Sequence, residues 1–232
     1  IISILGGGHH IAGNSICNDG LVIDFSRMKK IEINTQNRRA RVEPGATLAD
    51  FDRATQQYGL ATPTGINSTT GISGLTLGGG FGWLTREYGL TIDNLLSATV
   101  VTAGGQQIEA SETKNSDLFW AIRGGGGNFG VVTEYEYKLH PVGPEIMAGL
   151  LVFPFTNARQ ILQKYRDFAS SAPEELNVWV LLRHAPPLPF LPENVHGKMV
   201  LVMPVFYNGD FAKGEKLIDF IRGFGKLHGE HI

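Results

Sequence analysis

The chain contains one cysteine, Cys17, among 232 residues, and no apolar run that approaches the ~20 residues of a membrane span. A single cysteine excludes an internal disulfide framework and a thiolate metal cluster. Charge of either sign is also scarce: 20 Lys and Arg oppose 22 Asp and Glu, a formal charge of −2. This balance of charge gives no reason to expect binding to nucleic acid or to an anionic membrane. Hydrophobic residues at 42% and charged residues at 18% exclude disorder and a coiled coil.

The start of the chain lacks both an initiator Met and a secretion signal. Residues 1–5 are apolar but have neither a basic region nor a cleavage-like site beside them. Their pattern is typical of a buried strand that leads into the glycines that follow. We therefore expect a further segment upstream.

Glycine, by contrast, is abundant. The 30 glycines are roughly 13% of the chain, against a usual value of ~7%. They form runs at residues 6–8, 78–80 and 124–127, each between apolar segments. Tight turns in a β-rich fold are one explanation. Three separate runs favour a ligand cradle, because glycine allows a backbone to approach a ligand closely.

Hydrophobic periodicity predicts mainly strands in the first 140 residues. The predicted strands are residues 1–5, 21–25, 40–43, 95–102, 107–109 and 131–137. Thr47 and Asp50 have the spacing of a capped helix start, and Gly59 stands where that helix would end, in the C′ position. The apolar face of this helix comprises Leu48, Phe51 and Tyr58.

Residues 141–144, Pro-Val-Gly-Pro, predict a boundary between two domains, residues 1–140 and 145–232. Beyond it we expect strands at 148–155, 177–183 and 198–206 and two helices. The helices are predicted by Ala158, Ile161, Leu162, Tyr165, Phe168 and Ala169, and by Leu217, Ile218, Ile221 and Phe224. This order is typical of an α+β unit with an antiparallel sheet. Because it stops directly after a helix, we expect the second domain to be cut short as well.

Several familiar motifs are either absent or lie in the wrong structural context. Residues 125–130 match GxGxxG, but a strand is predicted after them where a dinucleotide fingerprint needs a helix. The sequence has no P-loop and no nucleophile elbow. Chance explains the glycosylation sequon at Asn67 better than a glycan does. A solvated tail explains His228 and His231 better than a metal site does.

Residues 5–13, Leu-Gly-Gly-Gly-His-His-Ile-Ala-Gly, have a different character. Consecutive glycine amides after a strand form a nest of N–H donors that is suited to a pyrophosphate. His9 and His10 follow directly and can reach the next ring system of the same ligand. Adjacent histidines in a loop are usually solvated, so their interpretation depends on the motifs further along the chain.

Residues 5–13 and 20–28 resemble the start of the flavin-linked oxidoreductases related to berberine bridge enzyme and 6-hydroxy-D-nicotine oxidase. Similar segments follow in register at residues 42–46, 63–83, 88–90, 93–94 and 118–132. The resemblance covers essentially all of residues 1–140 and is much weaker beyond. It implies an α+β protein: a vanillyl-alcohol-oxidase (PCMH-type) FAD-binding domain, followed by part of a substrate domain with an antiparallel sheet and helices.

In similar enzymes the glycine loop wraps the FAD pyrophosphate, and the next His bonds covalently to the flavin 8α-methyl carbon. The resemblance therefore implies covalent FAD through His9. It implies a single attachment, because Asn67 stands where many relatives have a second, cysteine tether. Leu5 also replaces an Arg that is frequent in relatives. The implied cofactor-binding residues are Gly6, Gly7, Gly8, His9, His10, Gly13, Ile66, Asn67, Gly71, Ser73, Gly74, Leu75, Gly78, Gly82 and Val132.

The implied function is an FAD-dependent oxidoreductase that removes hydride from a C–H bond bearing an alcohol or amine of a small-molecule substrate. Thr70, at a position that gates oxygen in relatives, is small enough to favour oxygen as the acceptor. No motif selects a general base among Tyr137, Tyr165, His184 and Tyr207. The alternatives are a dehydrogenase with another acceptor, a non-catalytic flavin-binding domain or fragment, and a cradle without flavin. We also expect these 232 residues alone to be an incomplete, inactive enzyme. The sequence does not determine the substrate, the compartment or the oligomeric state.

Overall fold

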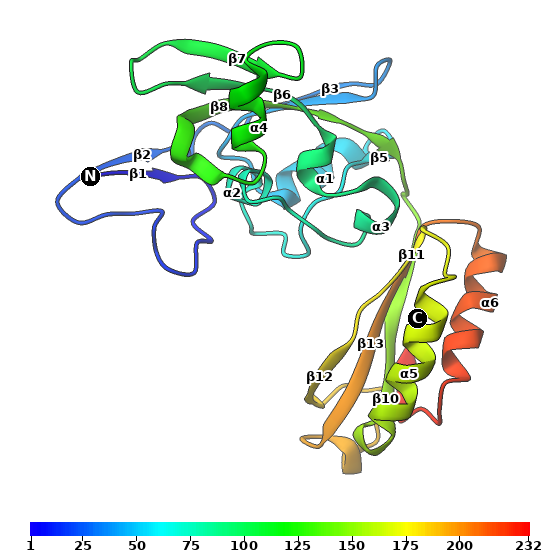
Figure 1. Ribbon diagram of the computed structural model, residues 1–232. Helices are drawn as coiled ribbons and strands as arrows, with labels where there is room; N and C mark the ends of the chain where they lie inside the picture. Colours follow the sequence, from blue (N-terminus) through cyan, green and yellow to red (C-terminus); the bar gives the residue numbers. More distant parts are fainter. The chain divides into compact units, whose positions relative to one another are not determined.

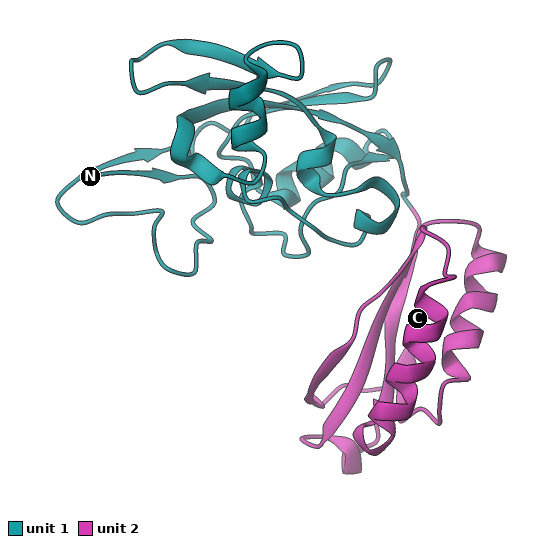
Figure 2. Ribbon diagram, in the orientation of Figure 1, with its two compact units in different colours: residues 1–144 teal, residues 145–232 magenta.

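Two antiparallel sheets, each of five strands, organise the chain (Figure 1). The computed structural model describes residues 1–232 and divides them into two units, residues 1–144 and 145–232 (Figure 2). Helices accompany both sheets, which confirms the predicted α+β class. No helix combines the length and the apolar character that crossing a membrane requires.

The sheet of residues 1–144 has the strand order β3-β4-β8-β6-β7. Its strands are β3 (Ile31–Asn34), β4 (Arg39–Val42), β6 (Leu95–Val101), β7 (Gln107–Ser111) and β8 (Val131–Lys138). Strand β8 lies at the centre, and β3 is an addition to the strands predicted from the sequence. Two small pairs complete the unit: parallel β1 (Ile2–Leu5) and β2 (Leu21–Asp24), and antiparallel β5 (Leu60–Ala61) and β9 (His140–Pro141).

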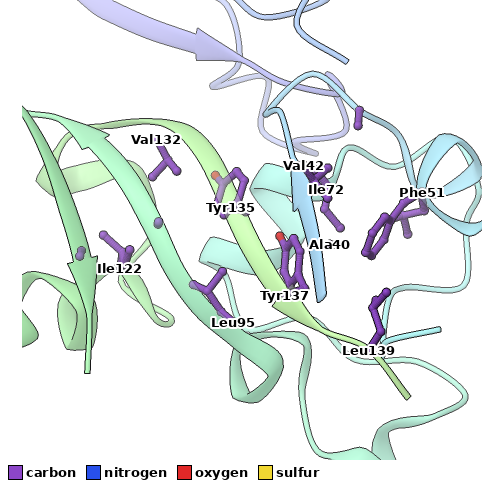
Figure 3. Close-up of a cluster of buried hydrophobic side chains, with 14 of the residues drawn as sticks. Ala40, Val42, Phe51, Ile72, Leu95, Ile122, Val132, Tyr135, Tyr137 and Leu139 are labelled. Atoms are coloured by element: carbon purple, nitrogen blue, oxygen red, sulfur yellow. The ribbon is translucent and has the colours of Figure 1, made fainter. Parts of the chain in front are cut away.

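Strand β8 departs from strict alternation. Its buried residues are Val132, Tyr135 and Tyr137, a spacing of three and then two (Figure 3). The register against β6 shifts between Thr99, which faces Glu134, and Val100, which faces Val132. Thr133 is therefore the extra residue of a β-bulge, and the bulge brings Val132 into the same core as the two tyrosines.

Strand β1 is not the buried strand that its composition predicts. Ile2 is 66% exposed, and Ile1 before it is also exposed. The reason is topological: β1 pairs only with β2 in a two-stranded sheet, so little of its surface is covered.

Short helices link the strands of the first unit. They are α1 (Leu48–Gln56), α2 (Ile72–Leu77), α3 (Thr85–Tyr88) and α4 (Ser116–Ile122), with 3₁₀ turns η1 (Thr91–Asn94) and η2 (Gly126–Phe129). The predicted cap of α1 is confirmed: Thr47 Oγ1 accepts from the Asp50 amide at 3.2 Å, and the Asp50 carboxylate accepts from the Thr47 amide at 3.0 Å. The Thr47 amide and the Thr47 hydroxyl both donate to the Asp50 carboxylate, and these two bonds lower the pKa of Asp50.

The end of α1 differs from the prediction. The helix stops at Gln56, so Tyr58 lies outside it and is exposed, and Gly59 is one residue beyond the C′ position. Gln56 Nε2 donates to the carbonyl oxygens of Leu60 and Val142 at 2.9 and 3.2 Å. These bonds connect the end of the helix to Leu60 of β5 and to Val142, the residue after β9.

The core of the first unit lies between the sheet and these helices (Figure 3). Phe51 of α1 and Ile72 of α2 are buried in the same cluster as Tyr137 of β8. The Tyr137 hydroxyl is within 2.7 Å of Thr76 Oγ1, so its polar end is satisfied. Burial raises the pKa of Tyr137 well above its ordinary value.

The second unit has strand order β11-β13-β10-β14, with β12 also paired to β13. Its elements are β10 (Met147–Pro154), α5 (Ala158–Ala169), β11 (Leu176–Val178), β12 (Leu181–His184), β13 (Met199–Tyr207), α6 (Phe211–Arg222) and β14 (Gly229–His231), with 3₁₀ turns η3 (Phe155–Asn157) and η4 (Glu193–Val195). Leu201 and Met203 of β13 belong to the cluster that includes α5 and α6. Val200 and Val202 belong to a second cluster with residues 185–195. Both faces of this sheet are therefore buried, which explains why β13 is a continuous apolar run.

Two predictions for this unit were wrong. The predicted strand 177–183 is split into β11 and β12, although both halves keep one register against β13. The break lies opposite Pro204, which has no N–H to donate to a ladder. The unit also does not stop after a helix, because β14 follows α6 and pairs with β10.

Candidate functional site

The glycine loop after β1 has a row of unpaired backbone amides. The β1–β2 pair ends where the Leu5 carbonyl accepts from the Phe25 amide at 2.9 Å. None of the amides from Gly6 to His10 donates a hydrogen bond within the chain. Gly8 has a φ of +71°, which favours glycine. A run of unpaired amides of this kind is suited to an anion such as a pyrophosphate.

The start of α2 closes on this loop. A Cβ on Gly7 would collide with the backbone nitrogen of Gly71, and a Cβ on Gly71 would collide with that of Gly7. Beside them, Gly6 lies against Ser73, whose Oγ donates to the Pro44 carbonyl at 2.7 Å. Gly71 is also the N-cap of α2, and no side chain caps this helix. The loop and the first turn of α2 therefore form one surface of backbone.

His9 is held beside this surface by a turn at residues 67–70. Its Nε2 lies 2.8 Å from Thr69 Oγ1, and its Nδ1 lies 3.5 Å from Thr70 Oγ1. Thr69 Oγ1 donates to Asn67 Oδ1 at 2.9 Å. His10 is exposed, and its side chain forms no hydrogen bond. The fold thus brings together His9 and Asn67, which are far apart in the sequence.

The glycines between residues 74 and 82 have two different roles. A Cβ on Gly80 would collide with Thr91 Oγ1, and a Cβ on Gly82 would collide with the Thr64 carbonyl. Close packing therefore accounts for these two glycines. A Cβ on Gly74 of α2 would meet no atom within 4 Å, so this face of the helix is open to a ligand.

The other predicted cofactor-binding residues differ in their surroundings. Gly13 follows the histidines, Ile66 is exposed, Leu75 packs partly buried against the core, Gly78 is the C-cap of α2, and Val132 is buried. The side chain of Val132 belongs to the core, so only its main chain remains for a ligand.

The four candidate bases are not alike. The side chains of Tyr137 and Tyr207 are buried in the cores of their units. The Tyr165 hydroxyl donates to the Val178 carbonyl at 2.7 Å. His184 lies on β12 and is exposed. No group among them is selected as a general base.

No cluster of three or more His, Cys, Asp or Glu is placed to hold a metal ion. His231 lies in β14 rather than on a helix, and its ring stacks on Phe190 at 5.8 Å between centroids. Two shallow hollows of about 640 and 630 Å³ border Phe168 and Phe220 on the second unit.

The residues of the first unit fit FAD. Unpaired amides from Gly6 to His10 would hold phosphate oxygens, and the open glycine face of α2 would admit a flat ring without a side chain in the way. The fold and this surface together define an FAD-binding domain. In agreement, residues 2–111 match the family described as "FAD binding domain".

Known proteins are similar to this chain over both units. An FAD-linked oxidoreductase of Dictyostelium discoideum is 37% identical over 225 residues, 96% of this chain and 46% of that protein. The crystal structure of 6-hydroxy-D-nicotine oxidase from Arthrobacter nicotinovorans has a TM-score of 0.87 at 33% identity and covers 100% of this chain and 49% of its own. A berberine bridge enzyme variant has a TM-score of 0.80 at 29% identity, over 95% of this chain and 43% of its own.

This chain belongs to the family of FAD-linked oxidoreductases that includes 6-hydroxy-D-nicotine oxidase and berberine bridge enzyme. It spans about half the length of the relatives that it matches. The predicted family and fold are therefore confirmed, including the second unit, where the sequence resemblance was weak.

Thr69, the partner of His9, was not predicted from the sequence. The available signal was the spacing of Asn67 and Thr69, because an Asn side chain often bonds to the backbone two residues later. Here the Thr69 amide does donate to Asn67 Oδ1, at 3.2 Å.

Proposed function

We propose that this protein is an FAD-dependent oxidoreductase that removes hydride from a C–H bond bearing an alcohol or amine of a small molecule. In this proposal residues 1–140 hold the cofactor and residues 145–232 contribute to the substrate domain. Relatives named 6-hydroxy-D-nicotine oxidase and chitooligosaccharide oxidase support the general reaction. When bound, FAD accepts the hydride, and the protein supplies anchoring and orientation. The observation behind the proposal is the run of unpaired amides with His9 directly beside it.

Reduction of the flavin is the direct test of this activity. Substrates of the two named kinds, a hydroxylated nicotine and an oligosaccharide, are mixed anaerobically with the flavin-loaded protein at its full length. We expect one of them to bleach the visible flavin absorbance, and air to restore it. Flavin that neither kind of substrate bleaches would favour the second candidate below.

We further propose that FAD is attached covalently, and at His9 only. His9 is exposed and adjoins the amides that would hold the pyrophosphate. Asn67 cannot form a thioether, so it offers no second attachment. A neutral imidazole is a competent nucleophile toward an electrophilic carbon.

Acid precipitation tests this attachment. Flavin should remain in the trichloroacetic acid pellet of the wild type and should move to the supernatant in His9→Ala. Mass spectrometry of a digest should find flavin on the His9 peptide alone. A flavin adduct on the Cys17 peptide would refute the single attachment, and free flavin from the wild type would refute the covalent bond.

Oxygen is the proposed electron acceptor. Thr70 precedes Gly71, and its carbonyl accepts from the Leu48 amide at 2.9 Å, so its backbone position is set. A berberine bridge enzyme with one glycine changed to alanine is described as a reticuline dehydrogenase, so one methyl group matters in that relative. Stopped-flow reoxidation in air-saturated buffer should be fast for the wild type and for Thr70→Val, and slower for Thr70→Leu. Reoxidation of the wild type over minutes would indicate a dehydrogenase.

A flavin-binding domain without catalysis is the second candidate. The placement of three candidate bases favours it. Tyr137 and Tyr207 are buried, and the Tyr165 hydroxyl already donates a hydrogen bond to the Val178 carbonyl. In that case the protein binds FAD, and its absorbance does not change with either substrate.

A further inference from the structure

Three side chains form a hydrogen-bonded relay that ends on His9. Asn67 Oδ1 lies 3.2 Å from the Thr69 amide nitrogen and 2.9 Å from Thr69 Oγ1. Thr69 Oγ1 lies 2.8 Å from His9 Nε2. The Thr70 amide donates to the Asn67 carbonyl at 3.0 Å and closes the turn that holds these groups. Sixty residues separate the two ends of the Thr69–His9 contact.

One backbone group determines the direction of every bond in this relay. The Thr69 N–H can only donate, so the Asn67 atom that faces it is the carbonyl oxygen and not the amide nitrogen. A carbonyl oxygen only accepts, so the Thr69 hydroxyl gives its one proton to Asn67. Lone pairs alone then remain on Thr69 Oγ1, and His9 Nε2 must carry the proton that joins them.

This direction excludes one of the two neutral tautomers of His9. With its proton on Nε2, the neutral ring has its lone pair on Nδ1. The polar neighbour of Nδ1 is Thr70 Oγ1 at 3.5 Å, which is longer than an ordinary hydrogen bond. We propose that Asn67 and Thr69 are positioning residues that hold His9 in this tautomer and so make Nδ1 the atom that bonds to FAD. The inference rests on the proposed attachment at His9.

The attachment balances as an oxidation. A bond forms between Nδ1 and the 8α-methyl carbon, while one C–H bond of that methyl group and the N–H bond of His9 Nε2 break. Two electrons pass to the flavin, and dioxygen removes them with the two protons as hydrogen peroxide. While the ring is positively charged, Thr69 Oγ1 accepts a charge-assisted hydrogen bond from Nε2. Thr69 is therefore expected to speed the step through its hydrogen bond to His9.

The first measurement is the tautomer itself. Nitrogen NMR of the full chain, labelled with ¹⁵N-histidine and free of flavin, distinguishes a protonated Nε2 from a protonated Nδ1, with His9→Ala assigning the signal. We expect Nε2–H in the wild type and in Thr69→Ser, and a mixture in Thr69→Val and Asn67→Ala. Ser68→Ala is the matched control, because Ser68 lies in the same turn and its side chain forms no hydrogen bond.

The second measurement is the rate at which added FAD becomes acid-stable on the same proteins, followed across pH. Thr69→Val should slow attachment about tenfold, the effect of one ordinary hydrogen bond, with Ser restoring it. The melting temperature of each variant shows whether the turn remains folded. A wild type whose His9 carries its proton on Nδ1 would overturn the relay. A Thr69→Val variant whose His9 tautomer and attachment rate equal those of Ser68→Ala would also overturn it. In both cases attachment at His9 would stand. A wild type that never attaches flavin would overturn both proposals, and His9→Ala would then match it.

Discussion

Two glycines at the start of α2 should respond in opposite ways to the same added methyl group. Gly71 has φ −75° and ψ 139°, values that alanine adopts freely, so Gly71→Ala introduces no backbone strain of its own. Its Cβ would instead collide with the backbone of Gly7, which is not a flexible side chain. Overpacking of this kind costs about 1–3 kcal/mol, which lowers the melting temperature by roughly 2–12 °C.

Gly74→Ala is the matched variant. A Cβ there meets no atom within 4 Å, and alanine is favoured over glycine in a helix by about 1 kcal/mol. The protein should therefore melt roughly 2–4 °C higher. The methyl group nevertheless stands on the open face of α2, so flavin binding should weaken in this variant as well as in Gly71→Ala.

Thermal melts of flavin-free protein and the flavin absorbance per protein after loading measure the two effects separately. Opposite shifts in melting temperature with a common loss of flavin are expected. Gly71→Ala with the wild-type melting temperature would show that the Gly7–Gly71 contact does not constrain the fold. Gly74→Ala with full flavin content would show that this face of α2 is not part of the cofactor surface.

Two further predictions concern buried polar groups. Burial and the charge of Lys138 lower the pKa of His140, whose Nε2 is within 2.7 Å of Asn94 Oδ1. Its contribution to stability is therefore complete above about pH 6.5 and is lost as the pH falls below that value, and His140→Gln should flatten this part of the melting curve against pH; an equal slope in both proteins would refute the assignment. Thr76→Val leaves the Tyr137 hydroxyl unpaired and should cost about 1–3 kcal/mol in urea unfolding. Adding Tyr137→Phe should recover most of that loss, and a double variant no more stable than Thr76→Val would contradict the argument.

The sequence by itself determined the features that depend on neighbouring residues. The Thr47–Asp50 cap involves groups three residues apart, and the glycine loop between β1 and His9 is one continuous segment. Strands β6, β8, β10 and β13 were predicted because each is a sustained apolar or alternating run. The family motifs also lie in such segments, so FAD was predicted without a structure.

Only the tertiary structure decided where distant segments meet. The bulge at Thr133 depends on the register of β6, and the break between β11 and β12 depends on Pro204 in the partner strand. Neither partner is visible in the periodicity of the affected strand. The relay from Asn67 to His9 is of the same kind, because its hydrogen bonds join segments that are adjacent only after α2 packs on the glycine loop. Short-range patterns record which face of an element is buried, but the atom that a side chain meets is set by the element packed against it.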